Sequence, residues 1–124
     1  MKNNLTLKVF YENEMIFSST RNWIHPLFDL EKYLMNNPKL DKSRINLEDK
    51  IIGKAAGALI IKMGIKKIKT NIISKLAIDI LEKNNVNYEY DILVDKISCK
   101  TEEVLERKND IDEAYKILKE RVEK

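Results

Sequence analysis

Asp-Lys-Ile-Ile-Gly-Lys-Ala-Ala-Gly-Ala-Leu-Ile-Ile-Lys-Met, residues Asp49 to Met63, is the stretch that decides the fold. Its apolar side chains recur at three- and four-residue intervals and cover most of the circumference, which predicts a buried helix. Gly53 and Gly57 lie four residues apart on one face, and each costs a helix about 1 kcal/mol relative to alanine. We therefore expect the backbone of this helix to approach a sheet closely.

The polar residues of this stretch gather at its start. Lys50 and Lys54 are like charges at an i,i+4 spacing, near the positive end of the helix dipole. This arrangement is unfavourable unless the carboxylates of Glu48 and Asp49, or a bound anion, neutralise it. It is the one chemically suggestive spot in the sequence.

On both sides of this stretch the sequence alternates between strand and helix patterns. It predicts a β-hairpin over 5–18, a helix that begins near Pro26, a polar connection over 40–48, a strand over 67–73, a helix capped by Ser74, a strand over 86–92 and an amphipathic helix over 110–124. A helix between two strands favours a parallel pair with a right-handed crossover. We therefore predict a single α/β domain over 1–124, with a core over about 5–103.

Composition narrows the classes of function. The chain has 124 residues with 23 Lys+Arg against 20 Asp+Glu, and a net charge of +3 is too small to indicate nucleic-acid binding. The lysine-rich run over 62–69 is interpreted as a solvated rim. The single cysteine, Cys99, excludes an internal disulfide and indicates a reducing compartment. No signal-peptide core or membrane-length apolar run appears, so we predict a cytoplasmic protein without a membrane partner.

Three runs carry a family resemblance: Arg21-Asn22-Trp23-Ile24-His25-Pro26-Leu27, Asp49-Lys50-Ile51-Ile52-Gly53-Lys54-Ala55-Ala56 and Ile73-Ser74-Lys75-Leu76-Ala77. Over roughly residues 5 to 103 the sequence resembles a prokaryotic family known only as the domain of unknown function number eighteen-ninety-three. Members resemble one another in a C-terminal Cys-Pro-x-Glu motif. This chain keeps only Cys99 and Glu102 of that motif.

The resemblance implies a cytidine deaminase-like fold, which is a three-layer α/β/α sandwich whose mixed sheet is opened by a β-hairpin. A zinc-dependent deaminase needs a His or Cys ligand and a glutamate two residues later at one helix start, and a Cys-x-x-Cys at the next. The expected helix starts at Asp49 and Ser74 offer neither imidazole nor thiolate. We therefore predict no metal and no cofactor.

The candidate ligand-binding residues are Asp49, Lys50, Lys54 and Ser74. If both helices begin at the carboxyl edge of adjacent parallel strands, these residues meet where open α/β sheets bind ligands. Two helix N-termini, a hydroxyl and two ammonium groups suit a phosphate or a carboxylate. The alternative is that Asp49 pairs with Lys54, Ser74 serves only as a cap, and Lys50 is solvated.

The sequence thus predicts an uncharacterised cytoplasmic protein of deaminase-like fold, without the zinc-deaminase residues, that binds a small anionic or nucleotide-like ligand. It leaves open whether the protein is an enzyme. One alternative is an interaction module that forms a homo-oligomer through its C-terminal helix. Another is a metal-independent enzyme in which Cys99 is the nucleophile and Glu102 assists it, although a lone cysteine is usually a small buried apolar residue.

Overall fold

The computed structural model describes residues 5–22, 24–95, 97, 105 and 110–122. Its elements are, in order, β1 (Leu7–Tyr11), β2 (Glu14–Ser19), α1 (His25–Met35), the short 3-10 helix η1 (Lys42–Arg44), β3 (Ile45–Ile52), α2 (Lys54–Met63), β4 (Lys67–Ser74), α3 (Lys75–Lys83), β5 (Asn87–Val94) and α5 (Ile111–Val122). The predicted hairpin, the two later strands and the helices capped by Ser74 and near Asp110 are confirmed.

The five strands form one mixed sheet in the order β2-β1-β3-β4-β5. Strand β1 is antiparallel to both β2 and β3, whereas β3, β4 and β5 run parallel to one another. The hairpin between β1 and β2 turns at Glu12 and Asn13, whose φ angles of 50° and 72° are those of a tight type I′ turn. The mixed sheet opened by a β-hairpin is therefore confirmed.

Strand β3 corrects two predictions, because residues 40–48 are not all a polar connection and Asp49 does not start a helix. Ile45 and Leu47 are fully buried, and β3 runs on through Asp49 to Ile52. Its backbone pairs with β1 on one side and β4 on the other, and this ladder overrides the helical spacing of the apolar residues. The extended backbone of Gly53 ends the strand, and α2 begins one residue later.

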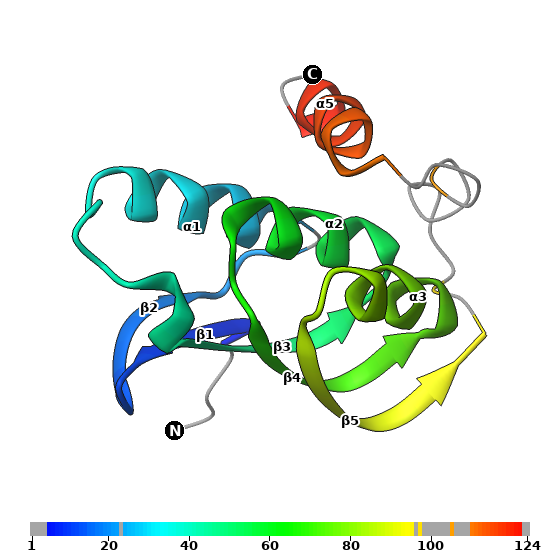
Figure 1. Ribbon diagram of the computed structural model, residues 1–124, viewed down its shortest axis with the longest axis horizontal. Helices are drawn as coiled ribbons and strands as arrows, with labels where there is room; N and C mark the ends of the chain where they lie inside the picture. The colour runs from blue at the N-terminus through cyan, green and yellow to red at the C-terminus, as the bar shows by residue number, and fades with distance from the viewer. Residues whose placement is uncertain (1–4, 23, 96, 98–104, 106–109, 123–124) are drawn as a thin grey trace.

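The helical layers also differ from the prediction. Helices α1, α2 and α3 connect β2 to β3, β3 to β4 and β4 to β5, respectively. In each case the two connected strands run in the same direction, and each connection steps across the sheet the same way. Right-handed crossovers that advance in one direction place their helices on the same face. Figure 1 shows this arrangement, with α1, α2 and α3 all on one side of the sheet. In the described part of the chain, the expected α/β/α sandwich is therefore replaced by a sheet with helices on one face.

Helix α5 forms a further layer over α1 and α2 (Figure 1). Its side chains Ala114 and Leu118 are 2% and 0% exposed. The hydroxyl of Tyr115 donates a hydrogen bond of 2.9 Å to Glu31 on α1, and Lys62 on α2 forms an ion pair with Asp112. The apolar face of this helix is thus buried within its own chain.

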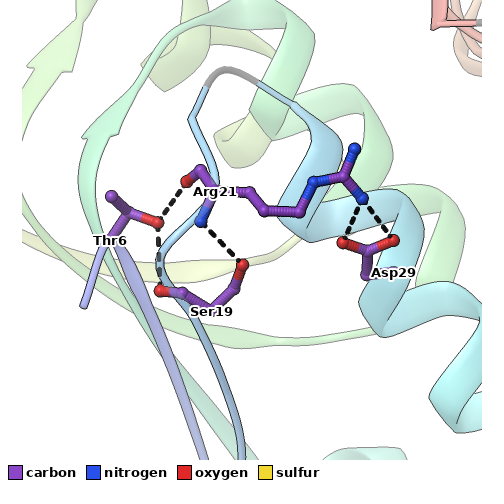
Figure 2. Close-up of polar contacts among 4 residues, drawn as sticks. All are labelled: Thr6, Ser19, Arg21 and Asp29. Carbon is purple, nitrogen blue, oxygen red and sulfur yellow. Dashed lines mark hydrogen bonds and ion pairs between the residues drawn. The ribbon is translucent and has the colours of Figure 1, made fainter. Parts of the chain in front are cut away.

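Side-chain contacts fix the connection from β2 to α1 (Figure 2). The Thr6 hydroxyl donates to the backbone carbonyls of Ser19 and Arg21, and the backbone N–H of Arg21 donates to the Ser19 hydroxyl. One guanidinium nitrogen of Arg21 lies 2.9 and 2.7 Å from the two carboxylate oxygens of Asp29 on α1. Arg21, one of the residues that carry the family resemblance, therefore anchors the first turns of α1.

The two glycines of the decisive stretch have separate roles. Gly53 is the N-cap of α2, whereas a Cβ on Gly57 would lie 3.2 Å from the Ile80 side chain and 3.9 Å from that of Ala77, both on α3. The close approach expected against a sheet is therefore an approach to a neighbouring helix. Gly64 ends α2 with a φ angle of 84°, as a C-terminal glycine does.

Candidate functional site

Strands β3 and β4 end side by side, and the helix that follows each of them begins at the same edge of the sheet. Ile52 and Ile73 are partners in the parallel ladder, so Lys54 at the start of α2 and Ser74 at the start of α3 belong to neighbouring positions of this edge. The structure thus brings these two predicted residues to one carboxyl edge. Lys54 is 3% exposed and Ser74 is 0% exposed, and both take part in interactions.

Two helix N-termini and a buried lysine lie at this carboxyl edge. The N-cap of α2, Gly53, has no side chain to cap the helix, and the first turns of α2 and α3 contain no acidic residue. The ammonium of Lys54 is therefore buried at the positive end of a helix dipole. Burial of a charge is costly unless an opposite charge or hydrogen bonds compensate it, and Lys54 takes part in an interaction within the chain.

The hydroxyl of Ser74 accepts a hydrogen bond of 3.1 Å from the backbone N–H of Ala77. Because this bond satisfies a buried helix donor, Ser74→Ala should lower the free energy of unfolding by about 1–2 kcal/mol in urea titrations. Ser43→Ala, at an exposed position in η1, is the matched control and should change it by less than about 0.5 kcal/mol. Equal stability of Ser74→Ala and wild type would show that the cap is dispensable.

Asp49 and Lys50 do not join Lys54 and Ser74. Both belong to β3, and the ladder partner of Asp49 is Thr70, four residues before Ser74. Four residues of a strand span roughly 13 Å. Asp49 and Lys50 instead line a hollow of about 250 Å³ whose other lining residues include Thr6, Lys8 and Lys69. The four predicted residues therefore form two separate pairs, because the strand continues where a helix was expected.

Asp49 lies where the alternation of β3 changes phase. Leu47 and Ile52 are both fully buried although they are five residues apart, and a regular strand would point them to opposite faces. Ile51, next to Ile52, is 47% exposed. Between Leu47 and Ile52, the Asp49 carboxylate accepts a hydrogen bond of 2.8 Å from the backbone N–H of Lys50. Sequence reasoning missed this change of phase. The exposed Ile51 next to the buried Ile52 indicates it only once 45–52 is known to be a strand.

The pKa of Asp49 is raised to about 7. Burial is the main cause, since it disfavours the charged carboxylate, while hydrogen bonds from the backbone N–H groups of Lys50 and Ile51 act in the opposite direction. Asp49 is thus a carboxyl group that changes its charge near neutral pH.

The residues at the helix starts do not fit a zinc site. With α2 now beginning at Lys54 rather than Asp49, its first turn still offers no imidazole or thiolate, and a buried ammonium there would repel a cation. Within the described ranges, no group of three or more His, Cys, Asp or Glu side chains is placed to hold a metal ion. The secondary candidates Cys99 and Glu102 lie outside the described residues.

Fold and candidate site together define a mixed α/β protein with a five-stranded mixed sheet and, in its described part, four α-helices, none long and apolar enough to cross a membrane. The chain belongs to the TM1506 family, described as a domain of unknown function (DUF1893), whose family model matches residues 1–122. The predicted family resemblance is thereby confirmed.

A solved structure supports the architecture. The chain is similar to the crystal structure of a DUF1893 family protein (TM1506) from Thermotoga maritima, with a TM-score of 0.82 and 24% sequence identity over 94% of this chain and 80% of that chain. At this identity the likeness concerns the fold alone. A comparison with curated proteins gave no match.

Proposed function

We propose that this protein binds a small anionic or nucleotide-like ligand at the carboxyl edge where α2 and α3 begin. The observation that carries the proposal is Lys54, an ammonium group 3% exposed in the first turn of α2. It lies beside the start of a second helix, and neither first turn contains a carboxylate. An anion at this edge would interact favourably with the ammonium and with both helix dipoles.

The chemical groups at this carboxyl edge limit the class of ligand that it can bind. The described residues there offer the buried ammonium of Lys54, the hydroxyl of Ser74 and the backbone N–H groups of two helix starts, without a glycine-rich loop, while the ammonium of Lys75 is paired with Asp95. This set suits a single phosphate or carboxylate group better than a polyphosphate. Because Lys54 and Ser74 are buried, the bound group would be enclosed and would exchange slowly.

The finer fold assignment is part of the same proposal. The mixed sheet opened by a hairpin supports a cytidine deaminase-like fold, whereas helices on one face argue against its three-layer form. A cytoplasmic location is proposed from the single cysteine in the sequence. The alternative of self-association through α5 has less support, since Ala114 and Leu118 are buried within the chain.

Thermal unfolding in the presence of inorganic phosphate or nucleoside monophosphates, with sodium chloride at matched ionic strength, tests the proposal. At about ten times Kd, a ligand of the native state should raise Tm by about 5 °C. Lys54→Met, which keeps an apolar stem but removes the charge, should abolish this increment whatever its own Tm. Lys50→Ala and Lys75→Ala should keep it, because Lys50 belongs to β3 and Lys75 is paired with Asp95 on the surface.

Native mass spectrometry of freshly purified protein provides a second measurement. An enclosed anion should remain bound in wild type and be absent from Lys54→Met. The proposal fails if no tested anion raises the wild-type Tm and no adduct is seen, or if Lys54→Met responds to the anion as wild type does.

A further inference from the structure

The face of the sheet opposite the helices carries a row of alternating charges. Leu7, Leu47 and Ile68 are buried on the helical side, so the adjacent residues of each strand point to the other side. The ladder partners there are Lys8 with Glu48, Glu48 with Lys69, and Lys69 with Glu89. Across β1, β3, β4 and β5 the charges therefore read plus, minus, plus, minus, and we name these four residues the charge row.

The rows on either side of the charge row are mostly polar and open in the described part of the chain, whereas the exposed apolar residues Ile51 and Ile92 lie further along β3 and β5. Hollows of about 490 and 250 Å³ lie on it, and Figure 1 shows no labelled helix on this side of the sheet. On one side of the charge row, Asn71 donates a hydrogen bond of 3.0 Å to Asp91. On the other side, Asn46 is the ladder partner of Phe10, and Lys67 is the ladder partner of Asn87. Neither neighbouring row repeats one sign of charge.

We propose that two copies of this chain associate face to face through this open side of the sheet, about a two-fold axis parallel to the strands. Such an axis reverses the order of the strands in the second copy. Lys8 then faces Glu89 of the partner subunit, and Glu48 faces Lys69 of the partner subunit. Because the symmetry repeats each pair, the charge row forms four opposite-charge pairs and no like-charge pair.

The pattern of charge selects this occupant and this orientation. A two-fold axis perpendicular to the strands would place each residue of the charge row opposite its own copy, so that every pair would repel. A polyanion such as RNA would meet Glu48 between the two lysines and Glu89 at the end of the row, and the row has no net charge. A row of four alternating charges is complementary to itself only when it is reversed, which is what the parallel axis does.

The expected complex is weak and sensitive to salt. Four strands about 4.8 Å apart and five residues with a rise of about 3.3 Å each give roughly 300 Å² in projection per copy, which is less than stable specific interfaces usually bury. Exposed ion pairs contribute little individually and are screened by salt. Association should therefore appear at high protein concentration and weaken as ionic strength rises.

Sedimentation velocity at protein concentrations up to about 1 mM, at low and high salt, tests the proposal. Wild type should dimerise in low salt. Lys69→Glu places Glu48 opposite a glutamate, and Glu48→Lys places a lysine opposite Lys69, so each variant alone should dimerise at least tenfold more weakly. Lys116→Glu, an exposed change on α5, is the matched control and should behave as wild type.

Mixing the two single variants restores both central pairs, so Lys69→Glu and Glu48→Lys should form a heterodimer that is tighter than either homodimer. The double variant Glu48→Lys/Lys69→Glu should also dimerise, because its two central residues again face opposite charges. Within one chain, however, this swap makes Lys8 and Glu89 neighbours of like charges. If the row only stabilises its own sheet, the double variant will therefore lose stability and will not recover association.

Three results would overturn the proposal. The first is a wild-type protein that stays monomeric over the whole concentration range. The second is a dimer that Lys69→Glu and Glu48→Lys leave unchanged. The third is a dimer of the single variants that mixing does not strengthen, which would place the contact elsewhere, for example on α5. Circular dichroism of each variant confirms that the sheet is intact in these measurements.

Discussion

Asp49→Asn should raise the free energy of unfolding at pH 8 by about 2–4 kcal/mol and leave it nearly unchanged at pH 4. The pKa of Asp49 is about 7 in the folded chain against an ordinary value of 3.8, so the folded state holds the proton more tightly. The contribution of this group to stability is therefore complete below pH 3.8 and is lost as the pH rises through about 7. Each pKa unit corresponds to about 1.4 kcal/mol.

Asparagine retains the oxygen that accepts the hydrogen bond from the backbone N–H of Lys50, but it removes the charge that burial disfavours. Urea titrations between pH 4 and pH 8 measure the difference. Asp79→Asn, at an exposed position on α3, is the control and should not produce this pH-dependent gain. If the difference in free energy of unfolding between Asp49→Asn and wild type is the same at pH 8 as at pH 4, the Asp49 carboxylate is solvated in the folded state.

Gly57→Leu should lower the free energy of unfolding by about 3 kcal/mol, because the added side chain enters the contact between α2 and α3. A Cβ alone would already lie 3.2 Å from Cδ1 of Ile80, which is 2% exposed. Overpacking of this kind commonly costs about 1–3 kcal/mol, and here it forces apart two helices that share the core. Thermal and urea unfolding monitored by circular dichroism measure the loss.

Gly57→Ala provides the matched comparison. The methyl group needs a shift of only a few tenths of an ångström by the Ile80 side chain, and alanine gains about 1 kcal/mol of helix propensity over glycine. The two effects should leave Gly57→Ala within about 1 kcal/mol of wild type. If Gly57→Leu proves equally stable, the two helices are not held at the observed distance by this contact.

Local chemistry made several elements predictable. Ser74 caps α3, Gly64 ends α2 in the left-handed region, and Pro26 lies in the first turn of α1, each as the residue type requires. The alternating residues of the hairpin and of β5 also predicted their strands. In these cases one short segment contains both the signal and the interactions that satisfy it.

The start of the decisive stretch was not predictable in this way. Ile52 has the helical spacing of Ala55 and Ala56, yet it ends β3, and Asp49 and Lys50 are strand residues rather than the first turn of a helix. The break at Gly53 and the alternation of Ile45 and Leu47 with polar residues favoured a strand, but the helical pattern continued across them. The candidate site was consequently divided, with only Lys54 and Ser74 at one edge.

The sequence by itself determined where most strands and helices form, which residues cap them and to which family the chain belongs, because these depend on neighbouring residues and short motifs. Only the tertiary structure decided that 45–52 is a strand, since its hydrogen bonds are made to β1 and β4, which are distant in sequence. It also decided that α1, α2 and α3 share one face, because the handedness of successive crossovers depends on strand order. The raised pKa of Asp49 and the open charge row follow from that arrangement, since burial and cross-strand neighbours exist only in the folded chain.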